Sequence, residues 1–472
     1  MDSRTFDVVV LGGGPAGTAA ALTLLNYSSL SVAVVERSGY GEPRIGETLS
    51  PGVQSLLAYL KVSADFAAAG HQPSLGTSAA WGSRTVQTRD FLFTPFGKGW
   101  HLDRRGFDAM LAEAVQRAGG TLWKNARLVD HQQAPAGPWR LGIERDGERM
   151  EVGARFVVDA SGRAATLAKR LGVQRRPVDR MVALIETFHF DRAVPRDTFT
   201  LIEACPTGWW YSARLPGDSM IVAFMTDADI AQRDGLHAPA AWLAALAEAE
   251  HTSARLRGGQ PGGGLRTHAA HSACLTEMFG NGWVAAGDAA VSHDPLSSSG
   301  IPRALDSGIR AARGAYDALR GRTSTLQAYG ADLAASFAQY LKTKAQYYRL
   351  EARWPDSAFW RRRRDAVTLD PHAVLQSRSA EDVSARELAA DLTDREYRLL
   401  CTLCARPTAA HEVVQAFHRA SGGLLPDERV ILALQSLLER GALVVSYPRA
   451  ASTSGRSMSS APPVMEAEGS NS

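Results

Sequence analysis

The hydrophobic pattern at the start of the chain predicts a βαβ unit. Residues 8–11 form an uninterrupted apolar run, as in a strand that is buried on both faces of a parallel sheet. A helix-forming segment follows over 18–25, and a second apolar run over 31–35 ends at Glu36. Glycines and polar residues interrupt this stretch, so it lacks the ~20 continuous apolar residues that a membrane-spanning helix needs. We expect an α/β fold and no membrane insertion.

Similar patterns recur further along the chain. Apolar positions at helical spacing predict an amphipathic helix over 107–118. Apolar runs that end at Asp159 and at Asp288 predict two more buried strands. Between them, the segment around 209–211 predicts a strand that pairs with 220–226. The chain therefore contains a parallel sheet and a second, interleaved sheet.

Shifts in composition divide the chain into four predicted parts. Three short helices at 394–405, 409–420 and 427–440, followed by a strand at 441–446, indicate a winged-helix-like module. The predicted parts are a first domain over 1–345, whose second sheet comes mainly from 75–100 and 180–275, a helical connector over 346–387, the module over 388–449 and a tail over 450–472. The tail has no periodicity and is rich in Ser and Pro, so we expect it to be disordered.

The charge of the chain argues against nucleic acid as a partner. The net charge is only +3 over 472 residues. The third helix of the module carries Arg429 and Arg440 against three acidic residues, which does not favour DNA binding. Four arginines at 361–364 are either a docking point for an acidic partner or a solvated helix end.

Cysteine and histidine usage excludes two other classes. Four cysteines in a chain of 472 residues do not form a disulfide framework. His268 and His271 lie on a predicted strand at a spacing that puts them on opposite faces, so we expect no metal site. No basic segment precedes the first strand, so no signal peptide is expected and a cytoplasmic location is the prediction.

The turn after the first strand has the spacing of a dinucleotide-binding loop. Gly12 permits a tight turn, Gly14 lets the backbone approach a pyrophosphate, and Gly17 lets helix and strand pack closely. The free N–H groups at the start of the following helix attract phosphate. Glu36, at the end of the second strand, is placed to accept hydrogen bonds from a ribose. Pro15, Ala16 and Arg37 flank these positions and belong to the same candidate site.

Four further motifs favour FAD over NAD as the dinucleotide. Each one ends a strand or begins a helix, where backbone donors and polar side chains can meet the cofactor. The last motif precedes a long predicted helix over 301–319, whose N-terminus would face the flavin edge that becomes anionic on reduction. The candidate cofactor residues in these motifs are Arg44 and Thr48, then Arg104, then Asp159 and Gly162, and finally Gly287, Asp288, Pro295, Ser299, Gly300 and Ile301.

Taken in this order over roughly 5–345, the motifs resemble the FAD-dependent monooxygenases of the aromatic hydroxylase type. The segment from Gly287 to Ile301 is similar to the tryptophan halogenase branch. The loops 46–51 and 208–216 look like those of flavoproteins that mature quinone-cofactor (tryptophylquinone) amine oxidases and dehydrogenases. The resemblance implies a Rossmann-type FAD-binding domain with an interleaved β-sheet substrate domain.

The same resemblance implies the reaction. In that group, FAD takes electrons from NAD(P)H or another reductant and reacts with O2 to give a C4a-hydroperoxide. The hydroperoxide then hydroxylates a tryptophan side chain inside a partner polypeptide. The alternatives are a hydroxylase or halogenase of a small aromatic molecule, a prenyl-chain reductase and, more distantly, a non-enzymatic peptide-binding flavoprotein.

Two departures from the halogenase pattern favour hydroxylation. Halogenases carry a Trp-x-Trp-x-Ile-Pro segment, but the matching stretch here has Tyr211 and Ala213 in place of the tryptophans. Halogenases also use a lysine early in the domain to carry the activated halogen. Between 62 and 123 the chain has only Lys98, in a glycine-rich stretch outside the segment 75–81.

Five residues are candidates for contact with the substrate or for proton transfer. Trp209, Trp210 and Tyr211 are candidates for an aromatic wall over the flavin, at least one of them being expected there, although alternating apolar residues on a strand are more often core. Strand alternation directs Trp209 and Tyr211 to one face and Trp210 to the other. Glu47 either supports the cofactor loop or acts on the substrate. His293 either assists proton transfer or is a structurally hydrogen-bonded loop histidine.

Overall fold

The first sheet of the structure is parallel at its centre, as the apolar runs predict.

The computed structural model describes residues 4–42, 44–93, 97–134, 137–191, 198–364, 373–377, 394–421, 427–439 and 443–446. The chain divides into two units, Met1–Ala366 and Val367–Ser472. The predicted tail at 450–472 lies outside the described residues.

The sheet of the first unit has strand order β20-β21-β11-β1-β2-β8, with β10 and β9 added at β11. Strands β11, β1, β2, β8 and β21 are joined by parallel pairings. Its strands are β1 (Arg4–Leu11), β2 (Val32–Val35), β8 (Thr121–Trp123), β9 (Ala126–Gln133), β10 (Trp139–Arg145), β11 (Glu148–Asp159), β20 (Phe279–Gly280) and β21 (Trp283–Ala285). This arrangement confirms the expected α/β class.

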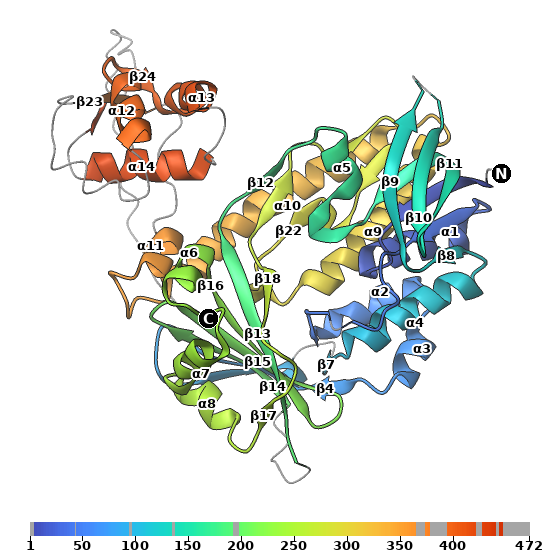
Figure 1. Cartoon of the computed structure of the whole chain (residues 1–472), viewed down its shortest axis with the longest axis horizontal. Helices are drawn as coiled ribbons and strands as arrows, with labels where there is room; N and C mark the ends of the chain where they lie inside the picture. The colour runs from blue at the N-terminus through green and yellow to red at the C-terminus, as the bar shows by residue number, and fades with distance from the viewer. Residues whose placement is uncertain are drawn as a thin grey trace, which may run out of the picture. The chain divides into compact units, whose positions relative to one another are not determined.

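Helices cover one face of this sheet with a continuous apolar layer. Apolar side chains of α1, α4 and α9 pack together with those of the central strands, and Figure 1 shows α1 beside α9. The helices of this part are α1 (Pro15–Tyr27), α2 (Gln54–Tyr59), α3 (Ser63–Ala68), α4 (Arg104–Arg117), α5 (Thr166–Arg170), α9 (Gly300–Ala318) and α10 (Ser324–Arg349). The packing places the N-termini of α1 and α9 at the carboxyl ends of the strands, where ligands of such sheets bind.

The second sheet is mostly antiparallel, in the order β17-β13-β16-β15-β14-β5-β6, with β18 paired to β13. Its strands are β5 (Gly76–Ala80), β6 (Gln87–Asp90), β13 (Met181–His189), β14 (Phe199–Cys205), β15 (Gly208–Leu215), β16 (Ser219–Asp227), β17 (Gln260–Pro261) and β18 (Arg266–Ala269). Helices α6 (Ala228–Arg233), α7 (Pro239–Ala247) and α8 (Glu250–Arg255) cover one face (Figure 1). The other face packs against α10 and α11 (Ala358–Arg364).

Two small sheets accompany the large ones in the described part of the first unit. One has the order β3-β7-β4 and the other β12-β19-β22. Their strands are β3 (Thr48–Leu49), β4 (Gln72–Ser74), β7 (Gly99–His101), β12 (Arg175–Pro177), β19 (Ala273–Leu275) and β22 (Val291–Ser292). Short 3-10 helices occur at η1 (Pro51–Val53), η2 (Phe91–Phe93), η3 (Gly162–Ala164), η4 (Gly287–Ala289) and η5 (Pro295–Ser297).

The described residues of the second unit form three helices and a three-stranded sheet of order β24-β23-β25. Its elements are β23 (Val374–Ser377), α12 (Asp394–Leu403), β24 (Thr408–Ala409), α13 (Ala410–Ser421), α14 (Asp427–Glu439) and β25 (Leu443–Ser446). Strand β23 pairs with both other strands, so residues 374–377 are not part of a helical connector as predicted. A four-residue strand is too short to give the alternating pattern that reveals longer strands.

The arginine run at 361–364 needs a correction as well. Arg363 is buried and binds the carboxylate of Asp227 with both terminal nitrogens, at 2.5 and 3.1 Å. Arg362 donates to Asp227 and to Asp229. Half of the run therefore holds α11 to the second sheet, rather than facing an acidic partner or solvent.

Candidate functional site

The glycine loop has the geometry that its sequence predicts. Gly12 has φ of +106°, and a Cβ there would lie 2.3 Å from the carbonyl oxygen of Ala160. A Cβ at Gly17 would lie 1.8 Å from the Gly12 oxygen, so α1 can approach β1 only with glycine at this position. At Gly14 the nearest atom to such a Cβ is Nη1 of Arg44, 3.9 Å away. Open space therefore lies beside Gly14, where the fingerprint puts a pyrophosphate at the start of α1.

Glu36 lies at the side of this loop. Its carboxylate is 4% exposed and accepts hydrogen bonds from Gly13 N–H at 2.7 Å and from Ser38. Arg44 bridges Glu36 at 2.9 Å and Asp108 at 2.8 Å, while Arg37 is exposed. The structure thus brings Glu36 and Arg44 together beside the glycine turn, and their roles as FAD ligands stay predictions.

The sequence suggested that Arg104 is free to meet a phosphate or flavin oxygen, but the structure shows its side chain bound to other residues of the protein. Its Nε is 3.0 Å from Asp108, which lies one helical turn further along α4, and its Nη1 donates to the backbone oxygen of Ile45. The side chain therefore fixes the loop 44–48 to α4. An acid four residues after the arginine is the signal that predicts this pairing.

Asp159 has a structural role instead of the predicted contact with the cofactor. The carboxylate is fully buried and accepts hydrogen bonds from Ser161 and from the N–H groups of Leu167 and Ala168 at 2.8 and 3.0 Å. It thereby holds the turn through Gly162, which has φ of +66°. Its oxygens are used by the protein itself.

Asp288 differs from Asp159 in that its carboxylate is 42% exposed and paired with Arg163 at 3.3 Å. Gly287, with φ of +61°, donates its N–H to Ser307 on α9 and packs against Ala16 of α1. Asp288 therefore lies between the N-terminal parts of α1 and α9 with an accessible carboxylate. This is the position expected for a group that binds the sugar chain of a flavin nucleotide.

The loop before α9 is a strained turn that exposes a helix N-terminus. Asp294 accepts a hydrogen bond from Leu296 N–H at 2.9 Å, and Ser298 has φ of +45°. Nothing lies within 4 Å of a Cβ built on Gly300, the first residue of α9, whereas Ile301 is buried. Pro295 begins η5, and Ser299 is the cap residue of α9. The open end of this 19-residue helix favours negative charge.

Three predicted parts of the site meet at one aromatic face. Trp209 and Tyr211 of β15 are buried in an apolar cluster with the partly buried Ile45 and Leu296 packed against it. Ile45 comes from the loop 44–48 and Leu296 from η5, so both candidate cofactor loops contact this face. We call it the aromatic face; its other rings are Trp81, Tyr348, Trp354, Phe359 and Trp360.

Trp210 does not belong to the aromatic face, so its assignment to the substrate pocket is wrong. It packs against Phe224 with ring centroids 4.5 Å apart and against Trp242 of α7 at 5.1 Å. Successive residues of a strand point to opposite faces, which leaves Trp210 in the core under α7 and α8.

Glu47 is the buried acid of the site. It is 4% exposed, and its Oε1 has no hydrogen-bond partner among the described residues. Burial raises the pKa of the Glu47 carboxyl from 4.5 to about 7, against the opposing charge of Arg104. A carboxyl with a pKa near neutrality suits proton transfer.

A chain of hydroxyls runs beside Glu47. The Tyr211 hydroxyl contacts Thr48 Oγ1 at 2.8 Å, and Thr48 contacts Thr200 at 3.0 Å. Thr200 in turn lies 3.1 Å from His101, whose pKa burial lowers to about 3. Thr48, a candidate cofactor residue, is thus placed between Tyr211 and Thr200.

Of the two roles left open by the sequence, proton transfer or a structural hydrogen bond, the structure favours the structural one for His293. Its Nε2 lies 3.0 Å from Arg303, and its ring packs edge-on against Tyr340 at 4.2 Å. Burial, together with the charge of Arg303, lowers the pKa of His293 to about 3. The imidazole is therefore neutral near pH 7 and cannot act as a general acid there.

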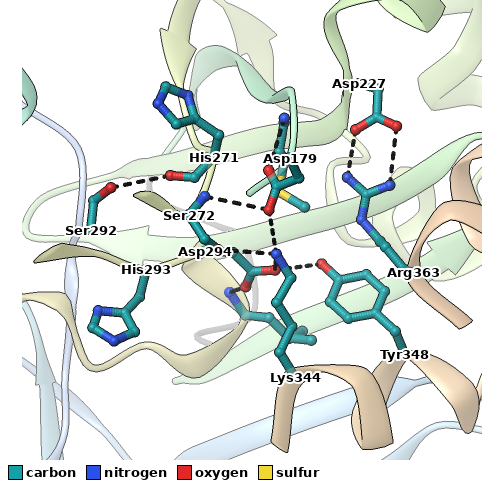
Figure 2. A network of polar contacts seen from close by, with 12 residues as sticks. Asp179, Asp227, His271, Ser272, Ser292, His293, Asp294, Lys344, Tyr348 and Arg363 are labelled. Carbon is teal, nitrogen blue, oxygen red and sulfur yellow. Dashed lines mark hydrogen bonds and ion pairs between the residues drawn. The ribbon is translucent and has the colours of Figure 1, made fainter. Parts of the chain in front are cut away.

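Three polar residues near the site were not among the predicted ones. Asp294, Lys344 and Tyr348, the last of which is a ring of the aromatic face, form a buried polar network (Figure 2). Asp294 was within the motif before α9, but Lys344 and Tyr348 lie on α10 with no signal in the local sequence.

Comparison with known proteins gives the following relationships. The family model of the FAD binding domain matches residues 5–343. The chain is 32% identical over 368 residues to LodB of Marinomonas mediterranea, named as an FAD-dependent oxidoreductase, covering 76% of this chain and 97% of that protein. It is 24% identical over 374 residues to tryptophan 2-halogenase of Chondromyces crocatus, covering 75% and 69%.

Solved structures show the same fold. The flavin-dependent halogenase CmlS matches with a TM-score of 0.70 at 20% identity, over 94% of this chain and 96% of CmlS. The myxobacterial chondrochloren halogenase CndH matches with a TM-score of 0.71 at 23% identity, over 91% and 99%. Among the described residues, no helix is long and apolar enough to cross a membrane, and no cluster of three or more His, Cys, Asp or Glu is arranged to hold a metal ion.

Proposed function

Because the chain belongs to the FAD-binding-domain family of flavin-dependent monooxygenases and halogenases, we propose that it hydroxylates a tryptophan side chain in a partner polypeptide. The proposed setting is the maturation of a quinone-cofactor enzyme. The proposed co-substrate is O2, and the electron donor is NAD(P)H or another reductant.

The relationship to LodB supports this choice over a small-molecule halogenase. LodB is matched over nearly its whole length at 32% identity, whereas the tryptophan 2-halogenase is matched over 69% of its length at 24%. The loops 46–51 and 208–216, which carry the resemblance to the maturation flavoproteins, supply Glu47 and Tyr211 to the site.

The observation that carries the choice of hydroxylation is the state of the amino groups near the aromatic face. Residue 79 on β5, which lies at this face, is alanine. Lys344 approaches this face beside the Tyr348 ring, and it is ion-paired with Asp179 at 2.5 Å and with Asp294 at 3.3 Å. An ammonium held by two carboxylates has no lone pair with which to accept a halogen.

Each part of the site has a distinct task in this reaction. The turn shaped by Gly12 and Gly17 would receive the pyrophosphate of FAD beside Gly14, and Asp288 would bind its sugar chain. Bound FAD supplies the activation of O2 for transfer of one oxygen to an electron-rich ring. Trp209 is fully buried, so it would support the aromatic face from within rather than touch that ring.

Glu47 would complete the reaction on the substrate. Oxygen transfer to the indole leaves a ring carbon that carries both oxygen and hydrogen. Breaking its C–H bond returns the electron pair to the ring and passes the proton to the Glu47 carboxylate. A pKa of about 7 leaves a large fraction of Glu47 ionised at neutral pH for this step.

Co-expression with a candidate precursor tests the proposal. The first candidate partner is an amine oxidase or dehydrogenase precursor whose gene lies next to the gene for this chain. Mass spectrometry of the partner should show a gain of about 16 or 32 mass units on one tryptophan, one oxygen per cycle. Gly17→Val, which disrupts the cofactor loop, is the control and should give no gain. Equal turnover of free tryptophan or indole would refute a polypeptide substrate.

The second candidate function is hydroxylation or halogenation of a small aromatic molecule. It is favoured by the similarity to tryptophan 2-halogenase and by the shared fold with CmlS. Product formation that requires chloride or bromide would establish it. A prenyl-chain reductase, the remaining alternative, would re-oxidise reduced flavin with its substrate in the absence of O2.

A further inference from the structure

Lys344 is the centre of a buried ion cluster that joins three parts of the first unit. The side chain comes from α10 and is 9% exposed. Its Nζ lies 2.5 Å from Asp179, next to the start of β13, and 3.3 Å from Asp294, next to η5. It also donates to Ser272 Oγ at 3.0 Å, before β19 (Figure 2). One ammonium thus binds two carboxylates from segments that are distant in sequence.

Asp294 links this cluster to the loop in front of α9. Its Oδ1 accepts the N–H of Leu296 at 2.9 Å, and its own N–H donates to the Tyr340 hydroxyl at 2.8 Å. The loop 294–300 is therefore fixed through both the side chain and the backbone of Asp294. This is the loop whose end exposes the N-terminus of α9 at the candidate flavin site.

The same carboxylate is connected to the aromatic face. Asp294 Oδ2 accepts a hydrogen bond from the Tyr348 hydroxyl at 2.8 Å. That hydroxyl accepts a hydrogen bond from the indole N–H of Trp209 at 3.1 Å. A continuous path of three polar contacts thus runs from Leu296, through Asp294 and Tyr348, to Trp209.

The electrostatics of the cluster favour a fixed structure over proton transfer. Although burial opposes ionisation, the charge of Lys344 lowers the pKa of Asp179 to about 2. Burial also opposes the charge of Lys344, but the two carboxylates raise its pKa above the usual value. The ammonium and the Asp179 carboxylate therefore stay charged at any pH at which the enzyme would work.

We propose that Lys344, acting through Asp294 and Tyr348, is a positioning residue that fixes the loop 294–300 against the aromatic face. The N-terminus of α9, where the flavin edge would lie, and the aromatic face that contains Trp209 would then keep a constant separation. The effect on the flavin does not depend on the substrate, whereas the effect on the substrate ring rests on the proposed function.

Two variants test the flavin part of this proposal. Lys344→Met leaves two buried carboxylates without their shared cation, and the loop must rearrange to relieve their repulsion. We expect a loss of at least tenfold in FAD affinity, measured by titration of the purified apoprotein. Lys344→Arg keeps the positive charge and should recover most of the affinity. Tyr348→Phe removes only the hydroxyl and should change the visible circular dichroism of bound flavin with a small change in affinity.

Glu203→Gln is the matched control for the loss of a buried charge. Glu203 is 6% exposed and lies on β14 of the second sheet, on the face covered by α8. Its carboxylate accepts hydrogen bonds from Thr252 of α8 at 2.7 Å. It should lower stability without changing FAD affinity or the flavin spectrum. The proposal is overturned if Lys344→Met binds FAD within twofold of the wild type. If Lys344→Met does not fold, an unchanged flavin spectrum in Tyr348→Phe overturns it. Neither result bears on whether tryptophan is the substrate.

Discussion

Replacing Glu47 by glutamine should remove a pH dependence that this single residue gives to the stability of the fold. The carboxyl is 4% exposed, and its pKa is about 7 in the folded chain against 4.5 when exposed to water. A raised pKa means that the folded state prefers the neutral acid. The stability from this preference is fully present below pH 4.5 and is lost as the pH rises through about 7. The difference between these pKa values corresponds to about 3 kcal/mol.

The measurement is the free energy of unfolding of the apoprotein in urea, for wild type and Glu47→Gln, at a series of pH values. Glutamine cannot ionise, so the variant should gain about 3 kcal/mol relative to the wild type between pH 4.5 and about pH 8. Glu113→Gln, on the exposed side of α4, controls for the removal of one negative charge. A difference between variant and wild type that stays constant over this range would show that Glu47 does not titrate as its burial requires.

Three further predictions concern the cofactor loop, the core and the arginine run. Gly14→Ala should fold normally but weaken FAD binding, whereas Gly17→Ala should prevent correct packing of α1 on β1; comparing FAD titration with urea unfolding separates the two effects. Trp210→Ala should lower the free energy of unfolding by about 3–5 kcal/mol and leave the FAD affinity unchanged, since the side chain lies in the core on the far face of the sheet. Asp227→Asn should cost about 3–5 kcal/mol in the same assay, because it leaves the buried Arg363 guanidinium without its carboxylate, and a loss below 1 kcal/mol would contradict that role.

The parts of the fold that the sequence predicted well are those whose causes lie within a few residues. The close approach at Gly17 is to the oxygen of Gly12 in the same turn, so the glycine spacing alone places the cofactor loop, although Gly12 also packs against Ala160 of a distant strand end. The predicted helices 394–405 and 427–440 end within two residues of α12 and α14, because helical periodicity is a local property. Strand alternation likewise separates Trp209 from Trp210.

The assignments that were wrong, or that missed residues, depended on partners elsewhere in the chain. Asp159 ends an apolar strand as a cofactor ligand would, but its carboxylate binds backbone N–H groups eight and nine residues further on. Arg363 belongs to a charge run in the sequence, but the fold places its partner Asp227, 136 residues earlier, beside it. Hydrophobic periodicity reports which face is buried and says nothing about which charges meet there.

Lys344 shows how far this limit reaches into the functional argument. From the sequence, hydroxylation was favoured because no lysine lies near residue 79, yet the fold brings a lysine to the back of the aromatic face from a helix more than 260 residues later. What keeps the argument valid is the charge state of that lysine and not its absence. With Asp179 and Asp294 in contact, the amino group is held as an ammonium, so it can orient Asp294 but cannot act as a nucleophile toward an activated halogen. A halogenating variant would therefore need a new lysine at residue 79. Removing the carboxylates that bind Lys344 would not serve instead, because it would also remove the contact that holds the loop before α9.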